Sequence, residues 1–173
     1  MMESLSNYYA LVAKIDEMTS RITSRYAGHI TCKKGCDDCC RHLAIFPVEG
    51  VALASALSRL PKEEVARLLK KAGSAAVDGP CPLLENSECA LYPYRPIICR
   101  THGLPVVMSN EGKRRIDFCP MNFKDLETLP GDAVIDLEIL NTMLAVVNRL
   151  FITEHFPPVN NRLSIAEALL LLR

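Results

Sequence analysis

The sequence predicts a mainly α protein in which a helical body carries an irregular, cysteine-rich layer and one small β-hairpin. Apolar residues recur at steps of three and four near both ends of the chain, which is the pattern of amphipathic helices. The middle of the chain holds all eight cysteines and most of the prolines. With 173 residues, 49% of them hydrophobic, and no internal repeat, the chain is expected to form a single domain over residues 1–173.

The first predicted element is a helix over residues 3–27, followed by Gly28 where a C-terminal cap is expected. Its apolar stripe consists of Leu5, Tyr8, Tyr9, Val12, Ile15, Met18, Ile22 and Tyr26. Residues 29–47 break this pattern and are predicted to form an irregular loop. The helical period then returns in residues 48–60 and again after Pro61, so we expect an antiparallel helical hairpin.

The second half of the chain begins with a loop over residues 78–103, in which a short turn of helix is expected near Ile97. Residues 104–109 and 113–119 flank Asn110-Glu111-Gly112 and predict a two-stranded hairpin. A long helix is expected from Asp132 to about His155. Its narrow polar stripe predicts that it is the buried centre of the domain.

A short final helix is predicted by the capping box of Ser164 and Glu167. The helical elements at 3–27 and 132–173 are then expected to pack with the cysteine-cluster region at about 30–120.

Composition disfavours several classes of partner and suggests a compartment. Lys plus Arg and Asp plus Glu each total 20, so the formal charge is zero and neither nucleic-acid binding nor a polybasic membrane surface is expected. The N-terminus lacks the apolar run of a signal peptide, and the apolar stretch at 168–172 is far too short to span a bilayer. We therefore expect a cytoplasmic protein, in which thiols stay reduced.

Eight cysteines in a reducing compartment indicate metal binding in preference to disulfides or inert core thiols. They form a first group of four within nine residues and a more dispersed second group: Cys32, Cys36, Cys39 and Cys40, then Cys81, Cys89, Cys99 and Cys119. The helical hairpin between Cys40 and Cys81 is expected to bring the groups together. Zinc and an iron–sulfur cluster both fit thiolate ligands, with the cluster slightly favoured. Which four cysteines share a centre, and whether there is one centre or two, stays open, and His42 and His102 are reserve ligands.

Three motifs carry a resemblance to a known family: the double-cysteine loop, C-P-L-L from Cys81, and C-A-L-Y-P-Y-R-P-I-I-C-R from Cys89 to Arg100. Together they resemble the YkgJ-type cysteine-cluster proteins, or CxxCxxCC family, described as zinc- or iron-chelating. The resemblance covers about residues 30–120, and it implies metal chelation by the eight cysteines. The gap between Cys32 and Cys36 is one residue longer than the family name implies.

Arg95 and Arg100 bracket Cys99, where a guanidinium would offset the negative charge of a thiolate-bound centre and donate to sulfur. The resemblance favours this role over that of a surface residue.

The main functional hypothesis is a metal-binding protein for redox chemistry, sensing or metal handling. The alternative is a cluster-assisted group-transfer enzyme, by analogy with the related domain of flagellin lysine methylases. A third is an interaction module that uses the basic run at 113–115. The spacing of Cys32, Cys36 and Cys39 also matches that of radical S-adenosylmethionine enzymes. Those enzymes resemble one another in an aromatic or apolar residue just before the third cysteine, where this chain has Asp38, and in a β/α barrel, which this sequence does not predict, so that class is rejected.

Overall fold

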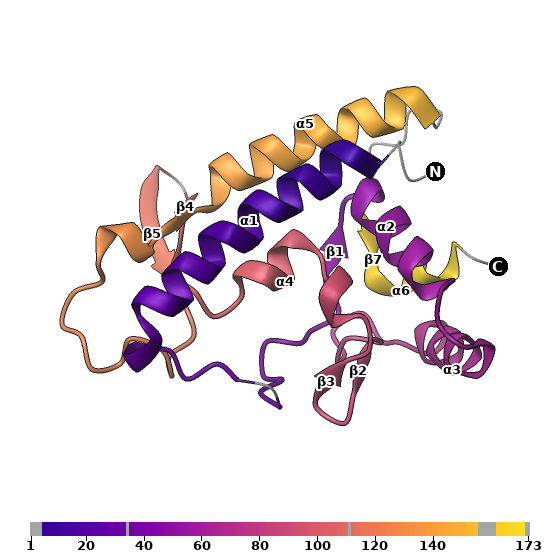
Figure 1. Cartoon of the computed structure of the whole chain (residues 1–173), viewed down its shortest axis with the longest axis horizontal. Coiled ribbons are helices and arrows are strands. Elements are labelled where there is room, and N and C mark those ends of the chain that lie inside the picture. Colours follow the sequence, from indigo (N-terminus) through magenta and orange to yellow (C-terminus); the bar gives the residue numbers. More distant parts are fainter. Residues whose placement is uncertain (1–4, 34, 111, 156–161, 172–173) are drawn as a thin grey trace.

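The structure, a computed structural model, describes residues 5–33, 35–110, 112–155 and 162–171. This part of the chain is mainly helical with a few short strands, as the sequence predicts. The outer ends of the predicted terminal helices, the hairpin-turn residue Glu111 and residues 156–161 lie outside it. In Figure 1, two long helices run along one edge of the molecule, shorter helices gather at one end, and irregular segments fill the space beneath.

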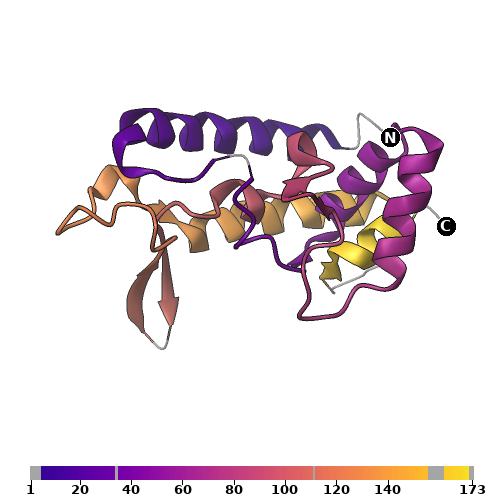
Figure 2. The ribbon, with the colours of Figure 1, turned by 90° about the horizontal axis from the view of Figure 1, so that it is seen from below.

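The two long helices, α1 (Ser6–Arg25) and α5 (Leu137–His155), run side by side (Figures 1 and 2). The predicted stripe of α1 faces this contact, and burial of its apolar side chains stabilises the pair. The first hydrophobic core is formed mainly by Leu5, Tyr8, Leu11, Ile15, Ile22, Leu140, Leu144 and Phe151. The predicted cap at Gly28 is wrong, because α1 ends at Arg25 with Tyr26 as its C-cap and the chain continues into a 3-10 turn at Ala27–His29.

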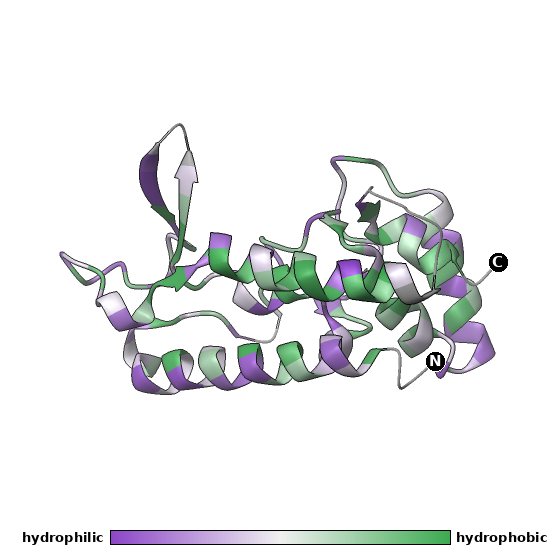
Figure 3. Cartoon of the chain, turned by 90° about the horizontal axis from the view of Figure 1, so that it is seen from above, coloured by the Kyte–Doolittle hydropathy of each residue, from purple (hydrophilic) through white to green (hydrophobic). Residues whose placement is uncertain are grey.

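The prediction that the long C-terminal helix is the buried centre of the domain is also wrong. One side of α5 enters the first core, but its opposite side is exposed, with Ile139 at 58% and Val146 at 52% of full exposure. Met143 and Leu150 continue this exposed apolar face, and in Figure 3 hydrophobic residues colour much of the α5 ribbon. The polar stripe is narrow because the helix has two apolar faces, of which one packs on α1.

The beginning of α5 also differs from the prediction. Residues 131–133 form a 3-10 turn and Ile135–Asp136 form strand β6, so the helix begins five residues later than Asp132. The carboxylate of Asp136 accepts from the backbone N–H groups of Glu138 and Ile139, both at 3.1 Å. Asp136 is therefore the residue that satisfies the first turn of the helix.

A second core lies at the other end of the molecule, where α2 (Pro47–Leu57) and α3 (Lys62–Gly73) both pack on α6 (Ile165–Leu170). Both predicted helices form, but the helix on which each of them packs is α6, a contact that the sequence did not predict. Close approach of α2 to α6 is possible because Gly50 has no side chain: a Cβ there would lie 3.2 Å from the Ala168 Cβ. The predicted capping box is confirmed, with the Ser164 hydroxyl accepting from the Glu167 N–H at 3.2 Å.

Short strands connect these parts. The predicted hairpin is confirmed as β4 (Val106–Asn110) and β5 (Lys113–Asp117), which project from the body (Figure 2). Strand β6 adds to β4 in parallel, which the sequence did not predict. Strand β1 (Ala44–Ile45) pairs with β7 (Leu163–Ser164), and this pairing anchors the end of the first cysteine loop beside α6.

Candidate metal centre

The first cysteine loop is held by tight backbone turns between α1 and β1. The N–H of Cys36 donates to the Lys33 carbonyl at 3.1 Å, and the N–H of Cys40 donates to the Asp37 carbonyl at 2.8 Å. These turns place four thiols along a short irregular path with few apolar residues to bury. Cys32, Cys36 and Cys39 are exposed, whereas Cys40 is half-buried.

Cys119 lies close to the first cysteine loop although it is far along the chain, and Gly103 lies beside both Cys32 and Cys119. The N–H of Cys119 donates to the Gly103 carbonyl at 3.4 Å. A Cβ on Gly103 would lie only 2.8 Å from the Cys32 sulfur and 3.7 Å from the Cys119 Cβ. Gly103 also has a φ of +85°, in the left-handed region that favours glycine. Position 103 therefore requires a glycine for two reasons: its backbone conformation, and the sulfur atom that leaves no room for a Cβ.

Asn122 is a fully buried side chain that fixes this meeting point. Its amide group donates to the Cys32 sulfur at 3.3 Å and to the Gly103 carbonyl at 2.7 Å. Its oxygen accepts from the Thr31 N–H at 2.9 Å. No pattern in the sequence indicates a role for Asn122, although it stands three residues after Cys119. An N–H donor to sulfur stabilises a thiolate and helps to set the properties of a bound centre.

Cys40, Cys81 and Cys89 meet on the other side of the loop. The N–H of Cys81 donates to the Cys40 carbonyl at 3.0 Å, so the two sequence groups lie together as expected. Cys89 is in strand β3 (Glu88–Cys89), where it pairs with Leu84 of β2 (Leu84–Glu85), and the Leu84 N–H donates to the Cys81 carbonyl at 3.0 Å. Cys81 and Cys89 both pack against the second core.

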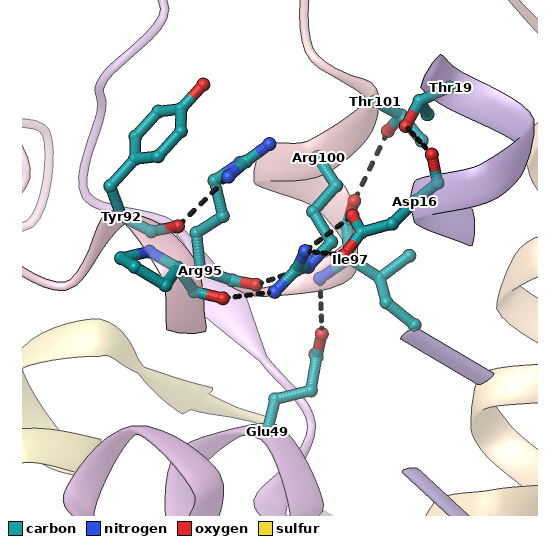
Figure 4. Close-up of polar contacts among 9 residues, drawn as sticks. Asp16, Thr19, Glu49, Tyr92, Arg95, Ile97, Arg100 and Thr101 are labelled. Carbon is teal, nitrogen blue, oxygen red and sulfur yellow. Dashed lines mark hydrogen bonds and ion pairs between the residues drawn. The ribbon is translucent and has the colours of Figure 1, made fainter. Parts of the chain in front are cut away.

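Cys99 lies in α4 (Ile97–Thr101), the short helix predicted near Ile97. Glu49 of α2 is only 2% exposed, and its carboxylate accepts from the Ile97 N–H at 2.9 Å and from the Phe46 N–H at 3.0 Å. One carboxylate thus caps the first turns of both α2 and α4, as Figure 4 shows for Ile97. Glu49 fixes the position of the helix that carries Cys99, and no pattern in the sequence indicated this role.

The two arginines next to Cys99 make different contacts. The Arg100 guanidinium is buried and bonds to the Asp16 carboxylate at 2.5 Å, to the Pro93 carbonyl at 2.7 Å and to the Arg95 carbonyl at 2.9 Å (Figure 4). Arg95 stacks over the Tyr92 ring at 4.0 Å and donates to the Tyr92 carbonyl at 2.9 Å. Its charge also acts on the Cys89 thiol, whose pKa it lowers against the larger effect of burial. Arg100 therefore ties α1 to the loop before α4, whereas Arg95 lies against Tyr92.

Burial raises the pKa of most of the thiols above the ordinary value, because a thiolate loses solvation there. It raises the pKa of Cys39 and Cys81 to about 11. The same cause raises the pKa of Cys32, Cys40, Cys89 and Cys99. Neighbouring thiols act in the same direction, since two thiolates repel each other. A bound cation would reverse this effect by stabilising the charged forms.

The reserve histidine ligands are differently placed. Both ring nitrogens of His42 are engaged, Nδ1 with the Ala76 carbonyl at 2.8 Å and Nε2 with the Ala166 N–H at 3.1 Å. His42 therefore has no ring nitrogen left for a metal in this structure. His102 is partly buried and lies beside the backbone of Cys39, and burial lowers its pKa.

The donor set suits a soft metal. All eight cysteines are free thiols. Thiolates are the ligands that iron–sulfur clusters use, and zinc also accepts four of them. Within the described ranges, no three His, Cys, Asp or Glu side chains are already grouped around the position of one metal ion.

Comparison with protein families gives a match over the cysteine region. The model of the CxxCxxCC family, described as "Putative zinc- or iron-chelating domain", matches residues 31–120. Comparisons with curated proteins and with solved structures gave no match. The matched segment contains all eight cysteines, from Cys32 to Cys119, and it makes up more than half of the sequence. The chain therefore belongs to the CxxCxxCC family of zinc- or iron-chelating domains.

Proposed function

We propose that the eight cysteines bind metal as thiolates and that the protein serves redox chemistry, sensing or metal handling. The observation that carries this proposal is the meeting of cysteines from separate parts of the chain in one layer. The Cys81 N–H bonds to the Cys40 carbonyl, and Cys119 lies beside Cys32 at Gly103. Inert thiols need no such convergence, whereas a metal that takes several ligands does.

An iron–sulfur cluster is favoured over zinc as the bound group. The side chains that converge are thiols, and His42 is already engaged with the backbone, so a mixed site with this histidine is disfavoured. The bond from the Asn122 amide to the Cys32 sulfur, at 3.3 Å, is of the kind that adjusts the potential of a cluster. A bound cluster would supply one-electron transfer, whereas zinc would serve as a cross-link in the fold.

Arg95 is proposed to offset part of the negative charge of the bound centre, because its guanidinium acts on the Cys89 thiol. Arg100 is proposed to contribute less directly, by holding the loop at Pro93 and Arg95 against α1. A cytoplasmic setting is proposed as well, because thiols stay reduced there and remain available as ligands. In the described part of the chain, no helix is both long and apolar enough to cross a bilayer.

Anaerobic purification followed by analysis of zinc, iron and acid-labile sulfide tests the proposal. A cluster gives a brown protein with iron and sulfide in similar amounts, and zinc gives a colourless protein with stoichiometric zinc. Thiol titration before and after chelation provides the control, since bound thiolates react slowly until the metal is removed. A folded protein without metal, in which all eight thiols react at once, would overturn the proposal.

A further inference from the structure

Four apolar side chains on the outer side of α5 form a continuous stripe on the surface. Each of them is between 41% and 58% exposed, and none belongs to either hydrophobic core: Ile139, Met143, Val146 and Leu150. Their steps of four, three and four residues keep them within a sector of about 60° around the helix axis, over a length of about 17 Å. Contiguous apolar surface of this kind marks an interaction site, whereas scattered exposed residues do not.

The spacing of the stripe indicates the kind of partner. Steps of four, three and four residues follow the period of about 3.5 residues by which one helix packs along another in a coiled coil. The steps read the same in both directions, so the stripe fits a copy of itself that runs antiparallel. With a two-fold axis between Met143 and Val146, these two residues face each other across the axis, and Ile139 faces Leu150. Such an interface uses the same surface of both copies.

The charged residues beside the stripe favour the antiparallel orientation. Glu138 and Arg149 are both exposed, and the helical period places them on the same flank of the stripe, near its opposite ends. The Glu138 carboxylate also accepts from the Ser109 N–H at 3.1 Å, which fixes its position. The two-fold axis brings Glu138 of one copy to within about 3 Å, along the helix, of Arg149 of the other, and it does so twice. A parallel pair would place like charges side by side, which is unfavourable.

We propose that a second copy of the chain covers this stripe, so that the protein forms an antiparallel, two-fold dimer through α5. The stripe is only about three turns long and offers much less area than permanent dimers bury, so the dimer is reversible, with a dissociation constant of roughly 10 to 100 µM. In Figure 1, α5 runs along one edge of the molecule, away from the first cysteine loop. The inference does not rest on the bound metal.

Sedimentation of the protein as isolated anaerobically, between about 1 and 500 µM, tests the proposal. Wild type is expected to change from monomer to dimer over this range. Val146→Glu places two charges beside the axis and should raise the dissociation constant at least about 100-fold, so this variant stays a monomer. Val77→Glu is the matched control, because Val77 is an exposed valine outside α5, and this variant should dimerise as wild type does.

Folding of each variant is checked by circular dichroism, and Met143→Glu replaces Val146→Glu if the latter does not fold. Dilute protein, at about 1 µM, is a monomer, so its unfolding midpoint does not depend on contacts between copies. A wild type that remains a monomer at about 500 µM would overturn the proposal and leave the stripe to a different partner. A dimer that Val146→Glu leaves intact, or that Val77→Glu abolishes, would overturn it as well.

Charge reversal tests the orientation of the two helices. Glu138→Lys and Arg149→Glu should each raise the dissociation constant by about tenfold, because each places like charges side by side at two points of the interface. The double variant restores opposite charges and should dimerise as wild type does. Single variants that dimerise like wild type, or a double variant that is weaker than both of them, would overturn the antiparallel dimer.

Discussion

Replacing Asp16 by asparagine tests whether Arg100 holds the fold or acts at the metal. The Arg100 side chain is only 5% exposed, and the Asp16 side chain is 47% exposed. Asp16→Asn removes the negative charge beside a buried guanidinium but keeps the size of the side chain and one acceptor oxygen. The two carbonyls of Pro93 and Arg95 continue to accept from Arg100.

The expected cost follows from this partial burial. Removing one partner of a fully buried ion pair costs about 3 to 5 kcal/mol, and a hydrogen bond to a charged group contributes about 1.5 to 3 kcal/mol. Because the Asp16 carboxylate is half in solvent and asparagine keeps one acceptor, we expect a loss of about 2 kcal/mol. In a chain of this size, such a loss lowers the melting temperature by roughly 4 to 8 °C.

Thermal and urea unfolding of protein in the same metal state measure this loss. Glu17→Gln is the matched control, since Glu17 is a carboxylate on the same helix that makes no contact with Arg100, and its replacement should change stability by less than about 0.5 kcal/mol. At 10 °C, where both variants remain folded, metal content should equal that of wild type. Equal stability of Asp16→Asn and Glu17→Gln would refute the structural role of the pair, and loss of metal from folded Asp16→Asn would assign Arg100 to the metal centre.

Burial, close contact and charge lead to three further predictions. Leu140→Glu should prevent stable folding, whereas Ile139→Glu should have little effect on the unfolding midpoint, because Leu140 is 4% exposed and Ile139 is 58% exposed on the same helix. Similar unfolding midpoints for the two variants would contradict the orientation of α5. Gly103→Ala should lower metal content, since its Cβ would lie 2.8 Å from a sulfur, while Gly28→Ala, with no atom within 4 Å, should retain the wild-type content. Competition with a chelator should show weaker metal binding at pH 7 than at pH 8, because a thiol must lose its proton to bind the metal. The expected difference is about tenfold for each proton displaced from thiols such as Cys81, whose pKa is raised to about 11. Equal binding at both pH values would show that these thiols are already ionised.

Local patterns in the sequence predicted the elements whose stability is local. The apolar stripe of α1 and the hairpin of β4 and β5 depend on residues close in the chain, and both were identified correctly. The capping box at Ser164 is likewise local. By contrast, the packing of α2 and α3 depends on α6, about 100 residues further along, whose short apolar sequence does not indicate which helices it joins. Helical period alone predicts that a face is buried but not against which partner.

The same limit applies to α5, whose narrow polar stripe predicts burial on all sides. Ile139 and Leu140 are adjacent and similarly hydrophobic, yet one is exposed and the other buried. Hydrophobic residues are common on protein surfaces, so a narrow polar stripe does not establish a central position. Only the position of α1 identifies the side that packs.

For the site, the residue type indicated the chemistry, but the grouping required the fold. Eight cysteines in a short region predict thiolate ligands from the sequence alone. Their order suggested a first group that ended at Cys40 and a second that ended at Cys119, and the structure brings members of the two groups together at two places. Cys119 reaches Cys32 only because the chain passes Gly103, and Cys40 reaches Cys81 through a backbone hydrogen bond of 3.0 Å.

The side chains that support the sulfurs were harder to foresee than the sulfurs themselves. Arg100 stood next to a cysteine and was expected to face it, but a residue that follows another in a helix points about 100° away around the axis. Its guanidinium accordingly reaches Asp16 of α1. Asn122, which does donate to a sulfur, lies 90 residues from Cys32, and a single asparagine carries no pattern that distinguishes it from one in a turn. Support for a metal centre is thus set by which segments meet, and sequence adjacency to a ligand is weak evidence for contact with it.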